Sequence, residues 1–182
     1  MKTESTAKYV LRLAGTLLLI TSVVAALLAG VNSITAPKIA ELTEQKTQQA
    51  IEAVLPGGGE SVDFTDDTGL VSIVYKGESG YAVQVAPSGF DGAVTMMVGV
   101  DFEGNVLGIS VIDQSETAGL GAVCAAGNSA GEAFRGQFKG MSGEVTVSKG
   151  GGEVEAITGA TITSRAVCKG VSAATACVAN MG

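Results

Sequence analysis

The chain has 182 residues and a formal net charge of −7, and it contains no histidine. The acidic balance argues against a nucleic-acid partner, because proteins bind phosphate backbones with clusters of Lys and Arg. Without histidine, Ser-His-Asp and Cys-His catalysis are excluded, and three cysteines are too few for a four-cysteine zinc site. We therefore expect no metal site, and redox chemistry would need an organic cofactor or a metal held by a partner.

The N-terminal region carries a long apolar segment. Residues 13–35 contain no charged residue, and a helix of roughly 20 residues spans the hydrocarbon core of a bilayer. Lys2, Lys8 and Arg12 precede the segment, so the positive-inside bias places the N-terminus in the cytoplasm. We expect a retained single-pass anchor in the cell (inner) membrane. A cleaved signal peptide is the alternative, although its apolar region would be shorter, about 7–15 residues.

The rest of the chain predicts a linker and one folded domain. Apolar residues recur at helical spacing within 40–55, and the run Pro56-Gly57-Gly58-Gly59 ends that helix. The predicted organisation is a cytoplasmic N-terminus at 1–12, a transmembrane helix at 13–35, a helical linker at 36–60 and an extracytoplasmic domain at 61–182.

The domain is expected to combine strands and helices. Glu103-Gly104-Asn105 predicts a hairpin turn, and Val167, Val171, Ala174 and Val178 recur at helical spacing. The fold class is therefore α+β, with a single N-terminal transmembrane helix followed by a domain that has an antiparallel sheet and flanking helices. The expected strands are 69–76, 81–86, 93–101, 106–112 and, weakly, 144–147, and the expected helices are 128–138 and 163–179.

The three cysteines do not form a recognisable motif. Cys124, Cys168 and Cys177 match neither a CxxC pair nor a zinc site. They are best interpreted as small buried apolar residues, while a disulfide between Cys124 and one of the others stays open.

A hydroxyl-rich segment leads into the last expected helix. Residues 155–164 read Glu-Ala-Ile-Thr-Gly-Ala-Thr-Ile-Thr-Ser. Gly159 and Ala160 keep side-chain bulk low there, and a helix N-terminus offers free N–H groups and a partial positive charge, which suit a phosphate. A polar turn in which Thr163 or Ser164 caps the helix explains the same residues.

A second glycine-bearing segment follows the strand expected at 106–112. In Ser115–Gly121, Gly119 and Gly121 allow the backbone to approach a flat ligand, and Glu116 and Thr117 offer an acceptor and a donor. An ordinary solvent-exposed loop is the alternative interpretation.

Four features in order resemble the FMN-binding domain family. Thr158–Thr161 is similar to the (S/T)GAT motif, whose last threonine carries FMN through a phosphoester. Glu116–Gly121 resembles the ETPGLG element, with Ala118 where proline is usual, and Gly89–Gly92 resembles the GFxG turn. The anchor exit, residues 32–39, is similar to that of the G subunits of the Rnf ferredoxin:NAD+ oxidoreductase complexes.

This resemblance implies an electron-carrying subunit of a membrane-bound, ion-translocating oxidoreductase complex, without complete activity alone. A separate flavin transferase would join the phosphate of FMN to Thr161, with Glu155 in its recognition motif where the family usually has aspartate. Glu116 is expected to tune or position the flavin. The implied partners are the other membrane subunits, the flavin transferase and membrane lipid around one helix. The implied cofactor-binding residues are Thr161, Thr158, Gly159, Ala160, Thr163, Glu116, Thr117, Gly119, Leu120 and Gly121.

Three other functions stay open. The chain could be the homologous C subunit of the sodium-pumping NADH:quinone oxidoreductase or a stand-alone membrane-tethered flavin reductase. It could also be a structural or adhesive domain without a cofactor.

Overall fold

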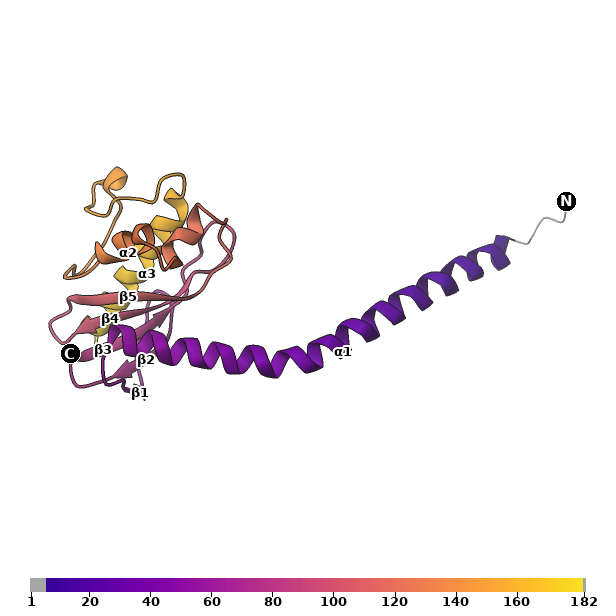
Figure 1. Ribbon diagram of the computed structural model, residues 1–182, viewed down its shortest axis with the longest axis horizontal. Helices are drawn as coiled ribbons and strands as arrows, with labels where there is room; N and C mark the ends of the chain where they lie inside the picture. Colours follow the sequence, from indigo (N-terminus) through magenta and orange to yellow (C-terminus); the bar gives the residue numbers. More distant parts are fainter. Residues whose placement is uncertain (1–5, 182) are drawn as a thin grey trace. The chain divides into compact units, whose positions relative to one another are not determined.

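The computed structural model describes residues 6–181, so Met1–Ser5 of the predicted cytoplasmic N-terminus lie outside the described residues (Figure 1). The chain divides after Glu44 into two compact units. Helix α1, Thr6–Val54, begins in the first unit and ends in the second. The second unit carries all the strands and the remaining helices described below.

The first unit is an apolar helix that is long and apolar enough to cross a membrane. Its large side chains are exposed; Leu18, for example, is 70% accessible. Polar side chains do not oppose insertion, because the Thr16 hydroxyl donates to the Arg12 carbonyl at 2.8 Å and similar bonds recur along the helix. The segments predicted as separate helices, 13–35 and 40–55, are parts of this one helix, which contains Pro37.

The second unit is built on a five-stranded antiparallel sheet in the sequential order β1-β2-β3-β4-β5. Asp101 closes the β4–β5 hairpin by accepting from the N–H groups of Glu103 and Asn105, and Gly104 between them has φ 88°. This confirms the predicted hairpin and the α+β fold. The strands are β1 Glu60–Val62, β2 Val71–Lys76, β3 Gly80–Val85, β4 Thr95–Asp101 and β5 Val106–Asp113.

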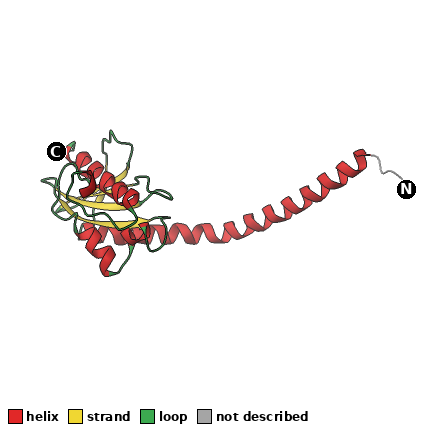
Figure 2. Cartoon of the chain, turned by 90° about the horizontal axis from the view of Figure 1, so that it is seen from above, coloured by secondary structure: helices red, strands yellow, loops and turns green. Residues whose placement is uncertain are grey.

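Helices cover both faces of this sheet (Figure 2). Successive residues of a strand point to opposite faces. Accordingly Val83 and Met96 pack in the larger core with helix α3, Thr161–Ala179, while Ala82 and Met97 pack with the last turns of α1. The 3-10 helix η1, Gly121–Ala125, and helix α2, Ser129–Gly136, lie between β5 and α3 in the chain.

One predicted strand is wrong, and one observed strand was not predicted. Residues 144–147 do not form a strand: Val147 makes only an isolated bridge with Val154, and the Val145 N–H donates to the Ser172 hydroxyl of α3 at 2.8 Å. Strand β1 was not predicted, because three residues are too short to show alternation.

The three cysteines are free and buried. Burial raises the pKa of the Cys124 and Cys168 thiols to about 11, so both are protonated at neutral pH. They act as small apolar residues of the core, in agreement with the first interpretation of their pattern.

Candidate functional site

A cavity of about 430 Å³ lies where four separate segments of the second unit meet. These are the turn at Gly89–Gly92, the loop 115–121, the short 3-10 helix η2 at Ser148–Gly150, and the start of α3 with the turn before it. The lining residues are Phe90, Glu116, Thr117, Leu120, Gly121, Lys149, Gly159, Ala160, Thr161, Ile162 and Thr163.

Helix α3 begins at Thr161, two residues earlier than predicted. The preceding turn is closed by the Ala160 N–H, which donates to the Ile157 carbonyl at 2.9 Å, and Gly159 has φ 77°, a left-handed conformation that favours glycine. Ala160 occupies the N-cap position without a side-chain hydrogen bond to the helix. The N-terminus of α3 is thus left without the hydroxyl cap that the sequence predicted.

The two residues predicted as caps lie inside the first turn of α3. The Ser164 hydroxyl accepts from the Ile157 N–H at 3.0 Å and donates to the Ala160 carbonyl at 2.9 Å, which joins the turn to the helix. Thr163 is buried and donates to Glu116. Neither residue caps the helix, because both lie inside it and Ala160 occupies the N-cap position.

The carboxylate of Glu116 connects the segments around the cavity. Its side chain is buried; Oε1 accepts from the N–H groups of Phe90 at 2.9 Å and Asp91 at 3.1 Å, and Oε2 accepts from the Thr163 hydroxyl. The Glu116 N–H in turn donates to the Gln114 side chain at 2.6 Å. One side chain thereby holds the Gly89–Gly92 turn and α3 against its own loop.

These hydrogen bonds determine the charge of Glu116. Burial raises the pKa of its carboxyl, but the bonds from the Thr163 hydroxyl and from the N–H groups of Asp91, Phe90 and Gly92 together bring the pKa below its ordinary value. Glu116 is therefore ionised at neutral pH, and the cavity wall contains a fixed negative charge.

Glycines permit this close packing. A Cβ at Gly121 would lie 2.6 Å from Thr163 Oγ1 and 2.9 Å from Glu116 Cβ, and a Cβ at Gly89 would meet Glu116 Oε1. A Cβ at Gly159 would lie 3.0 Å from Leu120 Cδ2, so the two loops also touch each other there. Larger residues at these positions would displace the walls of the cavity.

Exposed apolar side chains surround the cavity. Phe90 is 67% accessible, Ile162 51% and Leu120 42%, and all three line it. Among described residues 45–181, Phe102 is the one other large apolar side chain with such exposure. An apolar rim of this kind marks a binding surface rather than an ordinary protein surface.

The cavity includes eight of the ten residues expected to bind a cofactor. The other two, Thr158 and Gly119, do not line it; Thr158 is exposed in the turn and Gly119 has φ 75° in its loop. Glu155 is also exposed, while its backbone is held by Gln137, whose Oε1 accepts from the Glu155 N–H at 2.7 Å and whose Nε2 donates to its carbonyl at 3.2 Å.

Sequence reasoning missed three of the lining residues. Phe90 was recognised only as part of a turn, and Lys149 and Ile162 were not singled out at all. A lone lysine beside glycines and an isoleucine in a helical run carry no local signal of a site. Only their position in the folded chain identifies them.

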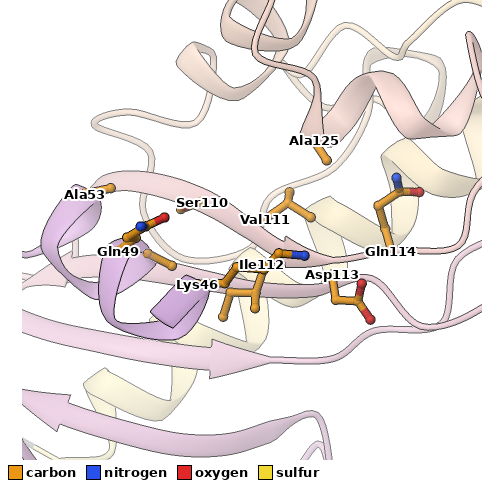
Figure 3. A pocket seen from close by; sticks show the side chains of 10 residues that line it. Lys46, Gln49, Ala53, Ser110, Val111, Ile112, Asp113, Gln114 and Ala125 are labelled. Carbon is orange, nitrogen blue, oxygen red and sulfur yellow. The ribbon is translucent and has the colours of Figure 1, made fainter. Parts of the chain in front are cut away.

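A larger cavity, of about 600 Å³, lies elsewhere in the second unit (Figure 3). Lys46 and Gln49 near the end of α1 border it on one side, and Asp113 and Gln114 at the end of β5 on another. Strand β5 is an edge strand of the sheet. This cavity contains none of the predicted site residues, so the chemistry favours the smaller one.

Comparison with known proteins agrees with this choice. Residues 89–176 match the family described as FMN-binding domain, and residues 1–54 match the RnfG N-terminal region. The first match begins at the Gly89 turn and contains every residue that lines the smaller cavity.

Several curated proteins are similar over most of their length. The chain is 35% identical to the G subunit of the Na(+)-translocating ferredoxin:NAD(+) oxidoreductase complex of Acetobacterium woodii, covering 91% of this chain and 89% of that protein. It is 32% identical to the G subunit of the ion-translocating oxidoreductase complex of Methanosarcina acetivorans, covering 90% and 91%. The corresponding protein of Escherichia coli strain K12 is 31% identical, with 81% of each chain covered.

Proposed function

The chain belongs to the family of G subunits of ion-translocating oxidoreductase complexes, and we propose that it carries FMN joined through its phosphate to Thr161. Family membership makes it a membrane-anchored, FMN-binding electron carrier and a component of a larger Rnf-type oxidoreductase. The covalent link and the residues that hold the cofactor are the proposal.

The position of Thr161 carries this proposal. Thr161 is the first residue of α3, lines the cavity, and has a partly accessible side chain. Within residues 6–181 its hydroxyl makes no hydrogen bond, whereas Thr163 is bound to Glu116 and Thr158 lies outside the cavity. An uncapped helix N-terminus stabilises a phosphate through its free N–H groups and partial positive charge.

The cavity also suits a flat ring. Its volume of about 430 Å³ is within the range of small-molecule sites, roughly 300–1,000 Å³. The exposed Phe90, Leu120 and Ile162 offer apolar contact to an aromatic ring system, and Gly121 keeps the cavity wall free of a side chain. The residues present therefore fit FMN at both its phosphate and its ring end.

Bound FMN would supply reversible uptake of one or two electrons. The uncapped start of α3 would hold the phosphate, and the apolar side chains that line the cavity would contact the ring. Glu116 shapes the cavity by holding its walls together, since both its oxygens already accept hydrogen bonds from the protein. No substrate pocket is required of a protein that passes electrons between partners.

Maturation by a flavin transferase is part of the same proposal. Glu155 is exposed, and Gln137 fixes the backbone beside it. Glu155, Thr158 and Gly159 are thus exposed and Thr161 is partly accessible, as access by a modifying enzyme requires.

Replacement of Thr161 by alanine tests the attachment site. Thr161→Ala should abolish the flavin phosphate that survives denaturation, because the acceptor hydroxyl is lost, while circular dichroism shows an unchanged fold. Thr146→Ala is the matched control, because Thr146 is exposed and lies outside both the motif and the cavity, and it should retain full flavin. Peptide mass spectrometry locates the modification, and a flavin phosphate on Thr158 or Thr163 would contradict the assignment.

Two other functions are less well supported. The C subunit of the sodium-pumping NADH:quinone oxidoreductase is disfavoured by the match of residues 1–54 to the RnfG N-terminal region. A stand-alone flavin reductase would purify without membrane partners, whereas a component of the proposed complex should copurify with them from mild detergent.

A further inference from the structure

Lys149 is the one lysine or arginine that lines the candidate flavin cavity. It lies in η2, and its turn is held on both sides: the Ser148 N–H donates to the Val154 carbonyl at 2.8 Å, and the Gly152 N–H donates to the Val147 carbonyl at 3.1 Å. Within residues 6–181 the one ion pair joins Lys38 and Glu41. Lys149 therefore has no carboxylate partner in the described part of the chain.

The unit that contains this lysine is acidic overall. Residues 45–182 contain seven Lys or Arg against fifteen Asp or Glu, a balance of −8. The cavity wall already contains the ionised Glu116. A phosphate at Thr161 would add a second negative charge, and the partial charge of a helix N-terminus, about half an elementary charge, does not balance both.

Backbone hydrogen bonds connect the turn of Lys149 to the segment that leads to the proposed acceptor. The bridge between Val147 and Val154 joins the base of the lysine turn to the segment that runs into the turn before Thr161. Phe90 and Leu120 come from other parts of the chain. The flavin phosphate, and not its ring, is the negative group that this arrangement would balance.

We propose that Lys149 is the positioning residue that supplies the positive charge for the phosphate of the cofactor at Thr161. This inference rests on the proposed function and deepens it. Loss of Lys149 would leave a phosphate close to the ionised Glu116 with only the helix N-terminus to stabilise it. The neutral ring end of the cofactor would be unaffected.

The test compares FMN with riboflavin, which lacks the phosphate. Both are titrated by fluorescence quenching onto the full-length chain in detergent, with Thr161→Ala in all variants so that binding is reversible. Lys149→Gln should weaken FMN binding about tenfold, a loss of roughly 1.4 kcal/mol, and leave riboflavin binding unchanged. Lys149→Arg should restore FMN binding. Lys169→Gln is the matched control, because Lys169 lines other cavities of the unit.

Three results would overturn the role of Lys149: no loss of FMN affinity, an equal loss of riboflavin affinity, or the same loss in Lys169→Gln. A Thr161→Ala chain that binds neither flavin overturns this role, because no charge-dependent affinity for FMN would then exist, whereas absence of covalent flavin from the chain with intact Thr161 is what contradicts the proposed function itself. When Thr161 is intact, the attached flavin should have the same reduction potential in Lys149→Gln as in the wild-type chain. A lower potential would mean that the cation lies beside the ring, which is the opposite of the proposal.

Discussion

The carboxylate of Glu116 receives hydrogen bonds from two parts of the chain far from it in sequence, the Gly89–Gly92 turn and the first turn of α3. Sequence reasoning expected this residue to offer an acceptor to the flavin and tune it. In the structure both oxygens accept from the protein, so we assign Glu116 the task of holding the cavity walls. A direct effect on the ring stays a prediction without a contact to support it.

Glu116→Gln should destabilise the chain by about 2 kcal/mol at neutral pH, because the amide NH2 cannot accept from the Thr163 hydroxyl. The pKa of Glu116 is lowered by folding, so its stabilising contribution is present above the ordinary value of 4.5 and is lost as pH falls through the folded-state pKa. The wild-type and variant free energies of unfolding should therefore converge in acid. Guanidinium titrations followed by circular dichroism at a series of pH values measure this.

Glu153→Gln provides the control for that series. Glu153 is exposed and outside the cavity, so its replacement should change the free energy of unfolding little at any pH. Equal stabilities of wild type and Glu116→Gln at pH 7, or a difference that persists below the folded-state pKa, would remove Glu116 from its structural role.

At the scale of elements, α1 combines two environments in one helix. Its apolar side chains are exposed through the first unit, but its last turns bury Ala50, Ile51 and Val54 against one face of the sheet. The close approach of the end of α1 to the sheet depends on Gly99 of β4. A Cβ at Gly99 would lie 2.9 Å from Val54 Cβ and would meet the Val54 carbonyl oxygen. The end of the anchor helix is thus a structural part of the folded domain.

Gly99→Ala should destabilise the second unit by about 1–3 kcal/mol, because the backbone carbonyl of Val54 cannot rotate away as a flexible side chain would. Gly108 is its cross-strand partner in β5, and a Cβ there meets nothing within 4 Å. Gly108→Ala should therefore be neutral. Thermal unfolding of the two variants side by side measures the difference, and equal melting temperatures would contradict the packing of α1 on β4.

For the molecule as a whole, the orientation in the membrane follows from the charges that flank the apolar segment. Lys2, Lys8 and Arg12 precede it, whereas Lys38 is followed by Glu41 and Glu44. The positive-inside bias then predicts a cytoplasmic N-terminus and an extracytoplasmic second unit. An FMN on this unit would accept and pass electrons on the outer side of the membrane.

Cysteine labelling tests this orientation. The native thiols are buried, and burial raises the pKa of Cys124 and Cys168 to about 11, so they should not react with maleimide in the folded chain. Glu78 lies at an exposed turn. A membrane-impermeant maleimide should label Glu78→Cys in intact cells that have been stripped of their wall or outer membrane. Ser5→Cys should react only after permeabilisation. The reverse pattern would invert the topology.

Local signals in the sequence account for most of the elements and for the family. An uncharged apolar run predicts a helix that could span a membrane, strand-like runs predict the four longer strands, and Glu103-Gly104-Asn105 predicts their last hairpin; all are present. The motifs at Glu116–Gly121 and Thr158–Thr161 indicated the family that the comparisons show. These features could be predicted because periodicity and turn chemistry act over a few neighbouring residues.

What those elements do together depends on their packing in three dimensions. In the folded chain Glu116 accepts a hydrogen bond from Thr163, 47 residues away, and helix α3 begins at Thr161 with no side-chain cap. The fold also bonds Val145 to Ser172 of α3 instead of to a strand, and it brings Lys149 into the cavity. A hydrogen bond between distant segments leaves no periodic trace in the chain. Burial and pairing are properties of the whole fold, whereas propensity belongs to each segment alone, so these contacts could not be predicted from the sequence.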